Sequence, residues 1–318
     1  MKAIALFSGG LDSILATKLI IDQGIEVKGI WFSSIFFGPD KGKWGKILKI
    51  VENFSNFSLE VVDISREFIE ILKNPKYGFG KCANPCIDCR ILMLKKAKEI
   101  MEREKASFVI SGEVVGQRPF SQRRKIMKLI EEESSLKGLL LRPLCAKLLP
   151  LSIPEEKKWV DREKLLNISG RGRKEQIKLA EKLGIRNYLS PAGGCVLTDK
   201  QIGKRVKDLL LIKEDPDLND FKIILHGRVF FFEDGTFFIV GRNKSENEIL
   251  LKLRKEDDIV LKVKDKPSPI GILRGKNKEK FLNIALNLTF RYSDAKNDPF
   301  AFILCIRNNK LETFKVTK

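Results

Sequence analysis

Residues 6–20 read LFSGGLDSILATKLI and place two glycines between serines, where an apolar run ends and an amphipathic stretch begins. This pattern predicts a strand, a tight turn and a helix, with residues 8–13 (SGGLDS) in the turn. Glycines let backbone N–H groups approach a ligand closely, and a helix N-terminus carries about half a positive charge. The turn therefore suits a phosphate or pyrophosphate, with Ser8 and Ser13 as further hydroxyl donors.

The first part of the chain alternates short β-rich runs with longer stretches whose apolar residues recur at i, i+3 and i+4. The β-rich runs are AIALFS (3–8), EVKGIWFSS (26–34), LEVVDI (59–64) and SFVISGE (107–113). Alternation of this kind predicts an α/β fold with a doubly wound parallel sheet. No internal repeat interrupts it.

The pattern of expected secondary structure changes at about residue 205. After IKEDPDLND (212–220), strands are expected at short spacing in KIILHGRVFFFEDGTFFIVGR (222–242), with Asp234-Gly235 as a hairpin signal. His226 is expected at the end of a strand. The sequence thus predicts two domains, an α/β domain over 1–205 and a smaller α+β domain over 206–318.

Charge favours a polyanionic partner. The 318 residues include 60 Lys and Arg against 41 Asp and Glu, a net charge of +19. Residues 206–318 hold 22 basic and 17 acidic side chains, whereas 1–205 hold 38 and 24, so the first region carries most of the positive field. Nucleic acid is the favoured partner, and a lysine-rich thermophile surface is the alternative.

Hydropathy predicts a protein without a membrane span. The most apolar stretch, LKGLLLRPLCAKLLPLSI (136–153), is interrupted by Arg142 and Lys147. The opening MKAIALF is too short for a signal peptide and runs directly into the glycines. A cytoplasmic location is therefore expected.

The glycine turn lacks the spacing of a Walker loop, GxxxxGK[ST], and of a GxGxxG dinucleotide motif. It resembles instead the SGGxDS loop of the PP-loop ATP pyrophosphatases, which cleave ATP between its α and β phosphates to adenylate a substrate. The resemblance implies that ATP binds Ser8, Gly9, Gly10, Asp12 and Ser13, and that Asp12 helps to hold Mg²⁺. Tight packing is the alternative explanation for the glycines.

Two further segments are expected to border the nucleotide. In doubly wound sheets, ligands bind at the carboxyl ends of the strands. This rule places the end of the second strand, Ile30 to Ser33, beside the adenine. Ser111 and Gly112, in the SGE that ends a later strand, fall on the same edge, although SGE is equally compatible with ordinary turn chemistry.

The cysteines suggest the chemistry. His226 is the only histidine, which excludes imidazole triads and multi-histidine metal sites, and six cysteines without a leader favour thiol or metal chemistry over disulfides. In KCANPCIDCRILMLKKAKEI (81–100), Asn84 is a natural N-cap and Pro85 a natural first helical residue. The next two cysteines, at 86 and 89, then share one face of the first turns, where the helix dipole favours thiolates.

Another cysteine, Cys195, follows two glycines in SPAGGCVLTD (190–199), where small neighbours permit a close approach to another site. NPCIDC (84–89) and AGGC (192–195) resemble segments that carry the active cysteines of tRNA 2-thiouridylases and 4-thiouridine synthetases. The resemblance covers about residues 1–205. It implies a tRNA uridine sulfurtransferase in which a uridine carbonyl is activated as an AMP adduct and sulfur then displaces AMP. Asp12, Cys89 and Cys195 are the implied catalytic residues.

Two sulfur-transfer routes fit these cysteines. In one, Cys86, Cys89 and Cys195 hold a [4Fe-4S] cluster whose open iron carries sulfide. In the other, one cysteine bears a persulfide and a second resolves it as a disulfide. The sulfur donor is accordingly sulfide or a persulfide carrier, and the cluster route is favoured because the pattern offers a third cysteine.

Other uses of the cysteines remain open. Cys82 completes the CxxxCxxC spacing of radical SAM enzymes, but Pro85 and the cap are expected to turn it away from the helical pair. Zinc bound by Cys82 and the three cysteines of the cluster route is a structural alternative. Cys145 and Cys305 lie in apolar runs and are expected in the core.

Candidate RNA contacts come from both domains. GQRPFSQRRKIMK (116–128) carries Arg118, Arg123 and Arg124, and SGRGRKEQIK (169–178) carries Arg171 and Arg173 at an expected helix start. All of these suit phosphate contacts, and a solvated helix surface is the alternative.

The stretch GRVFFFEDGTFFIVGRNKSENEILLKL (227–253) resembles the RNA-binding region of NFACT proteins through its GRNxxxN signature, which includes Arg242. Its phenylalanines suit base stacking, but most are expected to fill a sheet core. The sequence as a whole predicts a tRNA sulfurtransferase. The alternatives are an RNA-binding protein with a nucleotide-sensing domain, or a PP-loop enzyme that thiolates a small molecule.

Overall fold

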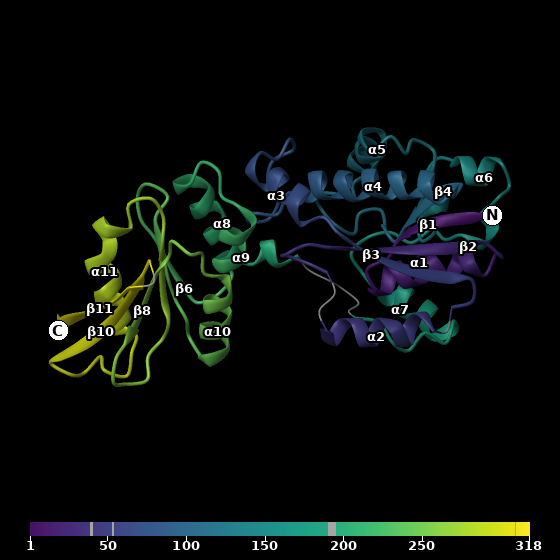
Figure 1. The fold of residues 1–318 in the computed structure, drawn as a ribbon. Coiled ribbons are helices and arrows are strands. Elements are labelled where there is room, and N and C mark those ends of the chain that lie inside the picture. The colour runs from purple at the N-terminus through teal and green to yellow at the C-terminus, as the bar shows by residue number, and fades with distance from the viewer. Residues whose placement is uncertain (39–40, 53, 190–194, 309) are drawn as a thin grey trace. The chain divides into compact units, whose positions relative to one another are not determined.

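A computed structural model describes residues 1–318 except 39–40, 53, 190–194 and 309 (Figure 1). The chain divides into two units, Met1–Thr198 and Asp199–Lys318. The boundary predicted at 205/206 falls within helix α8 (Lys200–Ile212). Arg205 of this helix donates to the carbonyls of Ile224 and Gly227 at 3.0 and 2.9 Å, which ties the whole of α8 to the second unit.

The first unit is built on a five-stranded sheet in the order β3-β2-β1-β4-β5. All of its strand pairs are parallel. The strands are β1 (Lys2–Leu6), β2 (Glu26–Ser33), β3 (Phe57–Asp63), β4 (Phe108–Ser111) and β5 (Leu140–Leu141). The predicted α/β fold with a parallel sheet is thus confirmed, and four of these strands lie within the predicted runs or within two residues of them.

Helices cover both faces of this sheet, as a doubly wound fold requires. The α-helices are α1 (Leu11–Ile21), α2 (Lys41–Val51), α3 (Ser65–Lys73), α4 (Cys86–Arg103), α5 (Arg124–Glu133), α6 (Ile153–Glu156) and α7 (Lys174–Lys182). Short 3-10 helices span Ala146–Leu148, Arg162–Lys164 and Val196–Thr198. In Figure 1, α4 and α5 lie on one side of the strands, and α1 and α7 on the other.

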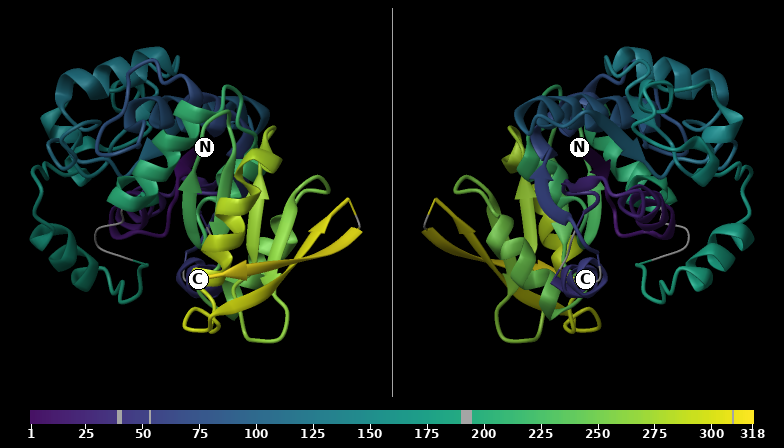
Figure 2. Two further views of the ribbon diagram at one scale, coloured as in Figure 1. Left: turned by 90° about the vertical axis from the view of Figure 1, so that its left-hand side faces the viewer. Right: turned by 90° about the vertical axis from the view of Figure 1, so that its right-hand side faces the viewer.

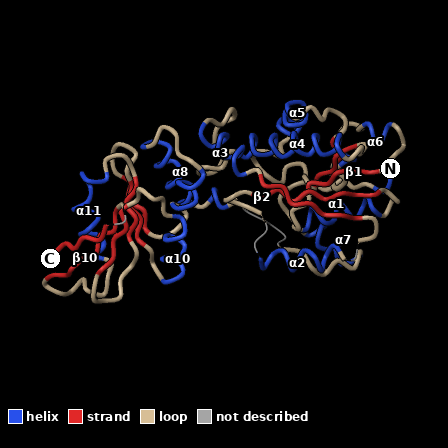
Figure 3. Tube along the Cα trace, viewed as in Figure 1, coloured by secondary structure: helices blue, strands red, loops and turns tan. Residues whose placement is uncertain are grey.

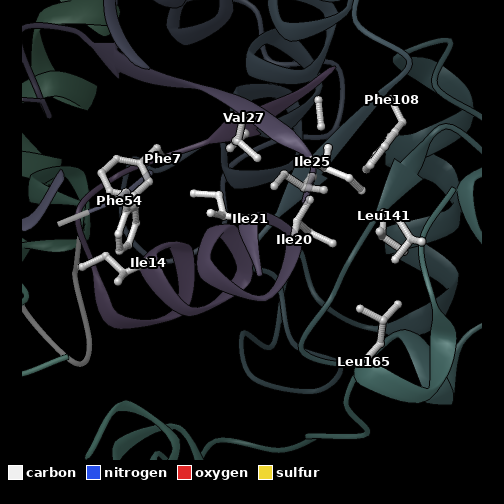
Figure 4. Packing of buried hydrophobic residues seen from close by; sticks show 14 of the residues in the cluster. Phe7, Ile14, Ile20, Ile21, Ile25, Val27, Phe54, Phe108, Leu141 and Leu165 are labelled. Carbon is white, nitrogen blue, oxygen red and sulfur yellow. The ribbon is translucent and has the colours of Figure 1, made fainter. Parts of the chain in front are cut away.

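Alternation along β1 explains the two apolar layers. Ala3 and Ala5 pack with α1 and α2 residues, in the cluster whose members Figure 4 shows around Ile20 and Val27. Ile4 and Leu6 point to the opposite face and pack with α4. Since successive strand residues face opposite sides, an uninterrupted apolar run gives a strand that is buried on both faces.

The second unit holds a six-stranded antiparallel sheet in the order β11-β10-β8-β9-β7-β6. Its strands are β6 (Arg228–Phe231), β7 (Phe237–Val240), β8 (Ile259–Val263), β9 (Gly271–Arg274), β10 (Phe300–Arg307) and β11 (Lys310–Thr317). Its remaining helices are α9 (Leu218–Ile223), α10 (Lys244–Leu253) and α11 (Lys278–Arg291). Figure 3 shows α11 on one side of this sheet and α8 and α10 on the other, which confirms a smaller α+β unit.

The predicted hairpin at Asp234-Gly235 is present between β6 and β7. Both residues have positive φ, 55° and 70°, as a two-residue turn of the mirror-image type requires. His226, by contrast, lies in a bend before β6 rather than at a strand end. The strand expected from Lys222 onward begins only at Arg228, because Lys222 and Ile223 end helix α9 and residues 224–225 form a turn. Asp217 caps the start of α9 by accepting from Asp220 N–H at 2.9 Å.

No helix among the described residues is both long enough and apolar enough to span a membrane.

Candidate active site

The glycine turn joins β1 to α1, as predicted, and is held by its own hydroxyls. Ser8 donates from its backbone N–H to the Ser13 Oγ at 3.2 Å, and Ser13 Oγ donates to the Gly10 carbonyl at 2.9 Å. Helix α1 begins at Leu11. The first N–H groups of a helix have no acceptor within it, so this turn presents donors to a ligand.

Gly9 has a second reason to be glycine. Its φ is +67°, and a Cβ placed there would overlap the Ile47 side chain and lie 3.1 Å from Leu189 Cδ1. The Gly9 carbonyl also accepts from Leu189 N–H at 2.9 Å. Packing therefore excludes a side chain at this position, while a phosphate contact from its backbone stays a prediction.

Asp12 lies in the first turn of α1 with its two oxygens in different surroundings. Oδ2 accepts from the Gln117 amide at 2.9 Å and lies 3.6 Å from an Arg173 Nη2. Oδ1 is buried and has no hydrogen-bond partner. Burial raises the pKa of this carboxyl, and the Arg173 charge and the Gln117 hydrogen bond oppose the rise. An unpaired carboxylate oxygen beside a turn that is expected to bind phosphate fits a ligand for Mg²⁺.

Three strand ends meet beside this turn. Leu6 of β1 is in register with Ile30 on one side and with Ser111 on the other. A Cβ on Gly112 would lie 2.6 Å from the Asp12 carbonyl carbon and 2.7 Å from Ser13 N, so Gly112 packs directly on the start of α1. Ile30 itself belongs to the core. Its side chain is therefore not available to a ligand, and an adenine contact by the segment from Ile30 to Ser33 stays a prediction.

Cys86 and Cys89 lie in the first turn of helix α4, which begins at Cys86. Pro85 is the N-cap rather than the first helical residue, one position later than the predicted cap at Asn84. Cys89 N–H donates to the Pro85 carbonyl at 2.9 Å, which closes the first helical turn. Cys86 and Cys89 are thus three residues apart in the first turn, as predicted.

Cys195 is brought to the same place from far along the chain. The glycines before it, within AGGC, lie outside the described residues. Just after Cys195, the Leu197 carbonyl accepts from Ala83 N–H at 3.2 Å, and the Thr198 carbonyl accepts from the Cys82 thiol at 3.4 Å. Two hydrogen bonds therefore hold the segment after Cys195 against the loop that leads into α4.

Burial controls the acidity of all three thiols. It raises the pKa of Cys89 to about 12 and that of Cys195 to about 11, and it also raises the pKa of Cys86. The prediction that the helix dipole favours thiolates here is therefore wrong for this structure. Desolvation of the charged form outweighs the partial charge of the helix end.

Arg118 connects the cysteines to Asp12. Its positive charge opposes the burial-driven rise in the pKa of each of the three thiols, and it acts in the same sense on the Asp12 carboxyl. The thiols also act on one another, since Cys86 and Cys195 each raise the pKa of Cys89 further. Cys86, Cys89 and Cys195, hereafter the cysteine trio, and Asp12 of the glycine turn are thus influenced by the same positive charge, that of the Arg118 guanidinium.

The described residues contain no group of three His, Cys, Asp or Glu side chains arranged to hold a metal ion. The cysteine trio therefore consists of thiols, the ligand type of iron–sulfur clusters, and these thiols lie near one another. They are not already arranged as a metal site. Cys82 has a positive φ of 58° and its thiol bonds to Thr198. Cys145 and Cys305 are buried in the core, as predicted.

The predicted RNA contacts fall into two groups. Arg118, Arg123, Arg124 and Arg171 are exposed, on the loop before α5, at its start and before α7. Arg173 is the N-cap of α7 and is half-buried against Asp12, which places it beside the glycine turn. RNA contact by these residues stays a prediction.

Arg242 and the rest of its signature have structural partners. Arg242 forms an ion pair with Glu246, one turn along α10. Asn243 caps α10 by accepting from Glu246 N–H at 3.0 Å, and Asn247 Oδ1 accepts from Ile270 N–H at 3.0 Å. A Cβ on Gly241 would collide with Asn247. The signature therefore stabilises the junction of β7 and α10.

Sequence reasoning missed two glutamines at the turn. Gln117 bonds to Asp12, and Gln176 on α7 acts on the same carboxyl, although neither of its amide atoms makes a hydrogen bond of good geometry. Gln176 is fully buried. Gln117 lies in the stretch 116–128 that carries predicted RNA contacts, but an amide carries no periodic signal that would identify its partner.

Comparison with known proteins agrees with this geometry. Residues 1–147 match the ThiI family model, described as thiamine biosynthesis protein (ThiI). Residues 227–318 match a second model, NFACT-R_2, described as the NFACT protein RNA binding domain. These matches confirm both predicted resemblances. The first region resembles the PP-loop tRNA thiolation enzymes, and the second resembles NFACT proteins.

Individual relatives resemble the first region. The tRNA-specific 2-thiouridylase MnmA of Petrotoga mobilis is 34% identical over 127 residues, which are 35% of this chain and 35% of that protein. A probable tRNA sulfurtransferase of Thermococcus kodakarensis is 30% identical over 148 residues, 45% of this chain and 36% of that protein. This chain thus spans little more than a third of the length of these relatives.

Among solved structures, a 4-thiouridine synthetase–RNA complex with bound ATP has a TM-score of 0.42 at 21% identity. The alignment covers 65% of this chain and 49% of that one.

Proposed function

We propose that this protein is an ATP-dependent tRNA uridine sulfurtransferase. The uridine carbonyl oxygen attacks the α-phosphorus of ATP and pyrophosphate leaves. Sulfur then attacks the adenylated carbon and AMP leaves. The match of residues 1–147 to the ThiI model and the names of the relatives support this reaction class.

The glycine turn supplies the nucleotide half of the reaction. The N-terminus of α1 and the Ser8 hydroxyl bind phosphate, and Arg173, beside Asp12, balances the negative charge. The Asp12 Oδ1 would hold Mg²⁺, which neutralises charge on the departing pyrophosphate when it is bound. Gln117 fixes the carboxylate by bonding to its other oxygen.

The cysteine trio supplies the sulfur half. Cys86, Cys89 and Cys195 would hold a [4Fe-4S] cluster, which offers an open iron for sulfide. The support for the cluster is donor type and proximity; zinc and a cysteine persulfide use the same thiols. In each case partial burial limits the access of water to the thiols and, by raising the pKa values of Cys89 and Cys195, disfavours their ionisation.

One observation carries the proposal: two hydrogen bonds hold the segment after Cys195 against the loop that leads into α4 and its two cysteines. Arg118 also acts electrostatically on Asp12 and on all three thiols. Sulfur transfer to an adenylated carbon requires that the phosphate site and the sulfur atoms serve one substrate atom. A guanidinium that acts on both groups supports an arrangement in which they serve a single bound nucleoside. It also offers a counter-charge for the AMP that leaves.

tRNA is the proposed partner. The exposed arginines at 118, 123, 124 and 171 and the net charge of +19 suit a polyanion. The match of residues 227–318 to an RNA-binding domain supports the same partner.

The test is a reconstitution in which the protein, purified without oxygen, receives ATP, Mg²⁺, sulfide and unmodified tRNA. We expect tRNA-dependent release of AMP and pyrophosphate, and thiouridine in the nucleoside mass spectrum. AMP release without tRNA, at an undiminished rate, would favour a small-molecule substrate. RNA binding with no AMP release under any condition would favour a non-catalytic RNA-binding protein.

A further inference from the structure

Two hairpins of the second unit use their aromatic side chains in opposite ways. In β6 and β7, Phe237 and Phe238 are fully buried, and Phe230 and Phe232 pack against the core. In the β10–β11 hairpin, Phe300 and Phe302 keep 42% and 41% of their surface exposed. Figure 2 shows this yellow hairpin extending beyond the neighbouring strands of its sheet.

The exposed rings stand on one face of the hairpin. Ala301, Ile303 and Cys305 alternate with them and point into the core beneath α11. The two rings meet edge to face, with centroids 5.7 Å apart and planes at 78°. Lys315, which pairs with Phe302 across the strands, places its Nζ 4.6 Å from the Phe300 ring centroid.

The outward face is apolar and positive. Leu304 pairs with Lys262 of β8, so a second exposed lysine joins this face. The described outward positions of β10 and β11 and the lysine of β8 include no acidic side chain; they are Phe300, Phe302, Leu304, Ile306, Leu311, Thr313, Lys315, Thr317 and Lys262. Leu311, near the hairpin turn, is 63% exposed.

We propose that Phe300, Phe302, Lys262 and Lys315 form a stacking platform for unpaired bases of RNA. This inference rests on the proposed function, in which tRNA is the partner. Aromatic rings flanked by lysines bind single strands because any base can stack on a ring while its phosphates meet the charges. Among the described residues of this unit, Phe300 and Phe302 are the exposed phenylalanines, and neither belongs to the signature around Arg242.

A second copy of the chain is the rival occupant. In a two-fold pairing of this face, each surface meets an identical one, so Lys262 and Lys315 would face the partner's lysines. Like charges without acidic neighbours disfavour such an interface. A polyanion, by contrast, is complementary to both lysines.

The test measures the affinity of the full chain for a fluorescein-labelled oligouridine of about 12 nucleotides, by fluorescence anisotropy. Phe302→Ala is expected to weaken binding by about 5- to 100-fold, because one stacked base is lost. Phe302→Tyr keeps the ring and is expected to stay within about twofold of wild type. Lys315→Ala is expected to reduce the salt dependence of log K by about one phosphate contact.

Leu251→Ala is the matched control, since Leu251 is 38% exposed on α10 of the same unit, and its affinity should equal that of wild type. Thermal unfolding of each variant confirms that it folds. The platform is overturned if wild type does not bind the oligonucleotide, or if Phe302→Ala binds as wild type does. A dimer that Phe302→Ala converts to a monomer, with RNA affinity unchanged, assigns the face to self-association.

These outcomes are separable from the proposed reaction. If the platform proposal is wrong, wild type still releases AMP in the presence of tRNA, but Phe302→Ala binds oligouridine as wild type does. If the proposed reaction is wrong, wild type releases no AMP, but its binding of single-stranded RNA still depends on Phe302.

Discussion

The two units treat their buried polar groups differently. Around the glycine turn of the first unit, Asp12 Oδ1 and both amide atoms of Gln176 are buried without hydrogen-bond partners. In the second unit, Arg274 is 2% exposed and its guanidinium bonds Asp258, Asp220, Asn219 and the Leu253 carbonyl. Among the described side-chain atoms of that unit, Thr236 Oγ1 alone is buried without a partner.

This difference separates a site from a scaffold. A buried polar atom without a partner costs about 1–3 kcal/mol, so a fold retains it where a ligand will satisfy it. A satisfied ionic network stabilises the fold only while all its members are present. Substitutions at Asp12 should therefore change chemistry with little effect on stability, and substitutions at Arg274 should do the reverse.

The largest effect is expected for Asp12→Asn. The amide keeps an oxygen for Gln117 but loses the charge that would hold Mg²⁺, so AMP formation should fall by about a thousandfold. Because burial raises the pKa of this carboxyl, replacing it should not lower the melting temperature. Both are measured on one preparation, by AMP release and thermal unfolding.

Asp22→Asn serves as the control for that experiment. Asp22 follows α1 at its other end and pairs with Lys18, so AMP formation should match that of wild type. An Asp12→Asn protein that melts much earlier than wild type would show that the carboxylate is structural.

Cys89→Ala tests the sulfur half of the same unit. Thiouridine formation should fall to background while tRNA-dependent AMP release continues, because the Asp12 carboxylate and the glycine turn are untouched. Nucleoside mass spectrometry and AMP release are compared on the same reaction. Cys305→Ala, a buried thiol in the second unit, should retain thiolation. Loss of both signals in Cys89→Ala would contradict a division of labour between the turn and the trio.

Arg274→Ala tests the scaffold. It leaves the fully buried Asp220 and the nearly buried Asp258 without this partner, and the free energy of unfolding of the second unit should fall by about 3–5 kcal/mol. Urea unfolding measures the change. Arg254→Ala, at the exposed end of α10, should change it by less than about 0.5 kcal/mol. If the two substitutions lowered the free energy of unfolding equally, the buried network of Arg274 would contribute no more to stability than an exposed arginine does.

Local pattern predicts the fold well where burial is two-sided. The runs 3–8 and 26–34 are apolar enough that a central parallel strand is the expected outcome, and β1 and β2 occupy them. The errors come from tertiary contacts. The sequence pattern places residues 200–205 with the first domain, because only the bonds from Arg205 to Ile224 and Gly227 show which unit α8 joins.

The candidate site was predictable in its motif residues and unpredictable in its environment. The spacing of SGGLDS identifies Asp12, but Arg173 reaches it from a helix that begins more than 150 residues later. The acidity of the thiols was predicted with the wrong sign for a related reason. A helix start is visible in the sequence, whereas the neighbours that bury Cys89 come from the fold.

The smallest expected effect concerns Arg242, which sequence similarity presents as an RNA contact and the structure pairs with Glu246. The Arg242 hydrogen bond, opposed by burial, lowers the pKa of Glu246 from its ordinary 4.5 to about 2. A carboxyl with a lowered folded-state pKa contributes stability above its unfolded pKa and loses it as the pH falls. Arg242→Ala should therefore cost about 1 kcal/mol at neutral pH, and the difference from wild type should disappear between about pH 4.5 and 2.

Chemical unfolding across that pH range measures the difference, and oligouridine affinity at neutral pH accompanies it. Arg228→Ala is a suitable comparison, because Arg228 is an exposed arginine of β6 that stacks on Tyr292. A stability loss that vanishes in acid, with RNA affinity retained, assigns Arg242 to the scaffold. Weaker RNA binding with unchanged stability would assign it to the RNA surface, and the aromatic platform on β10 would then share that role.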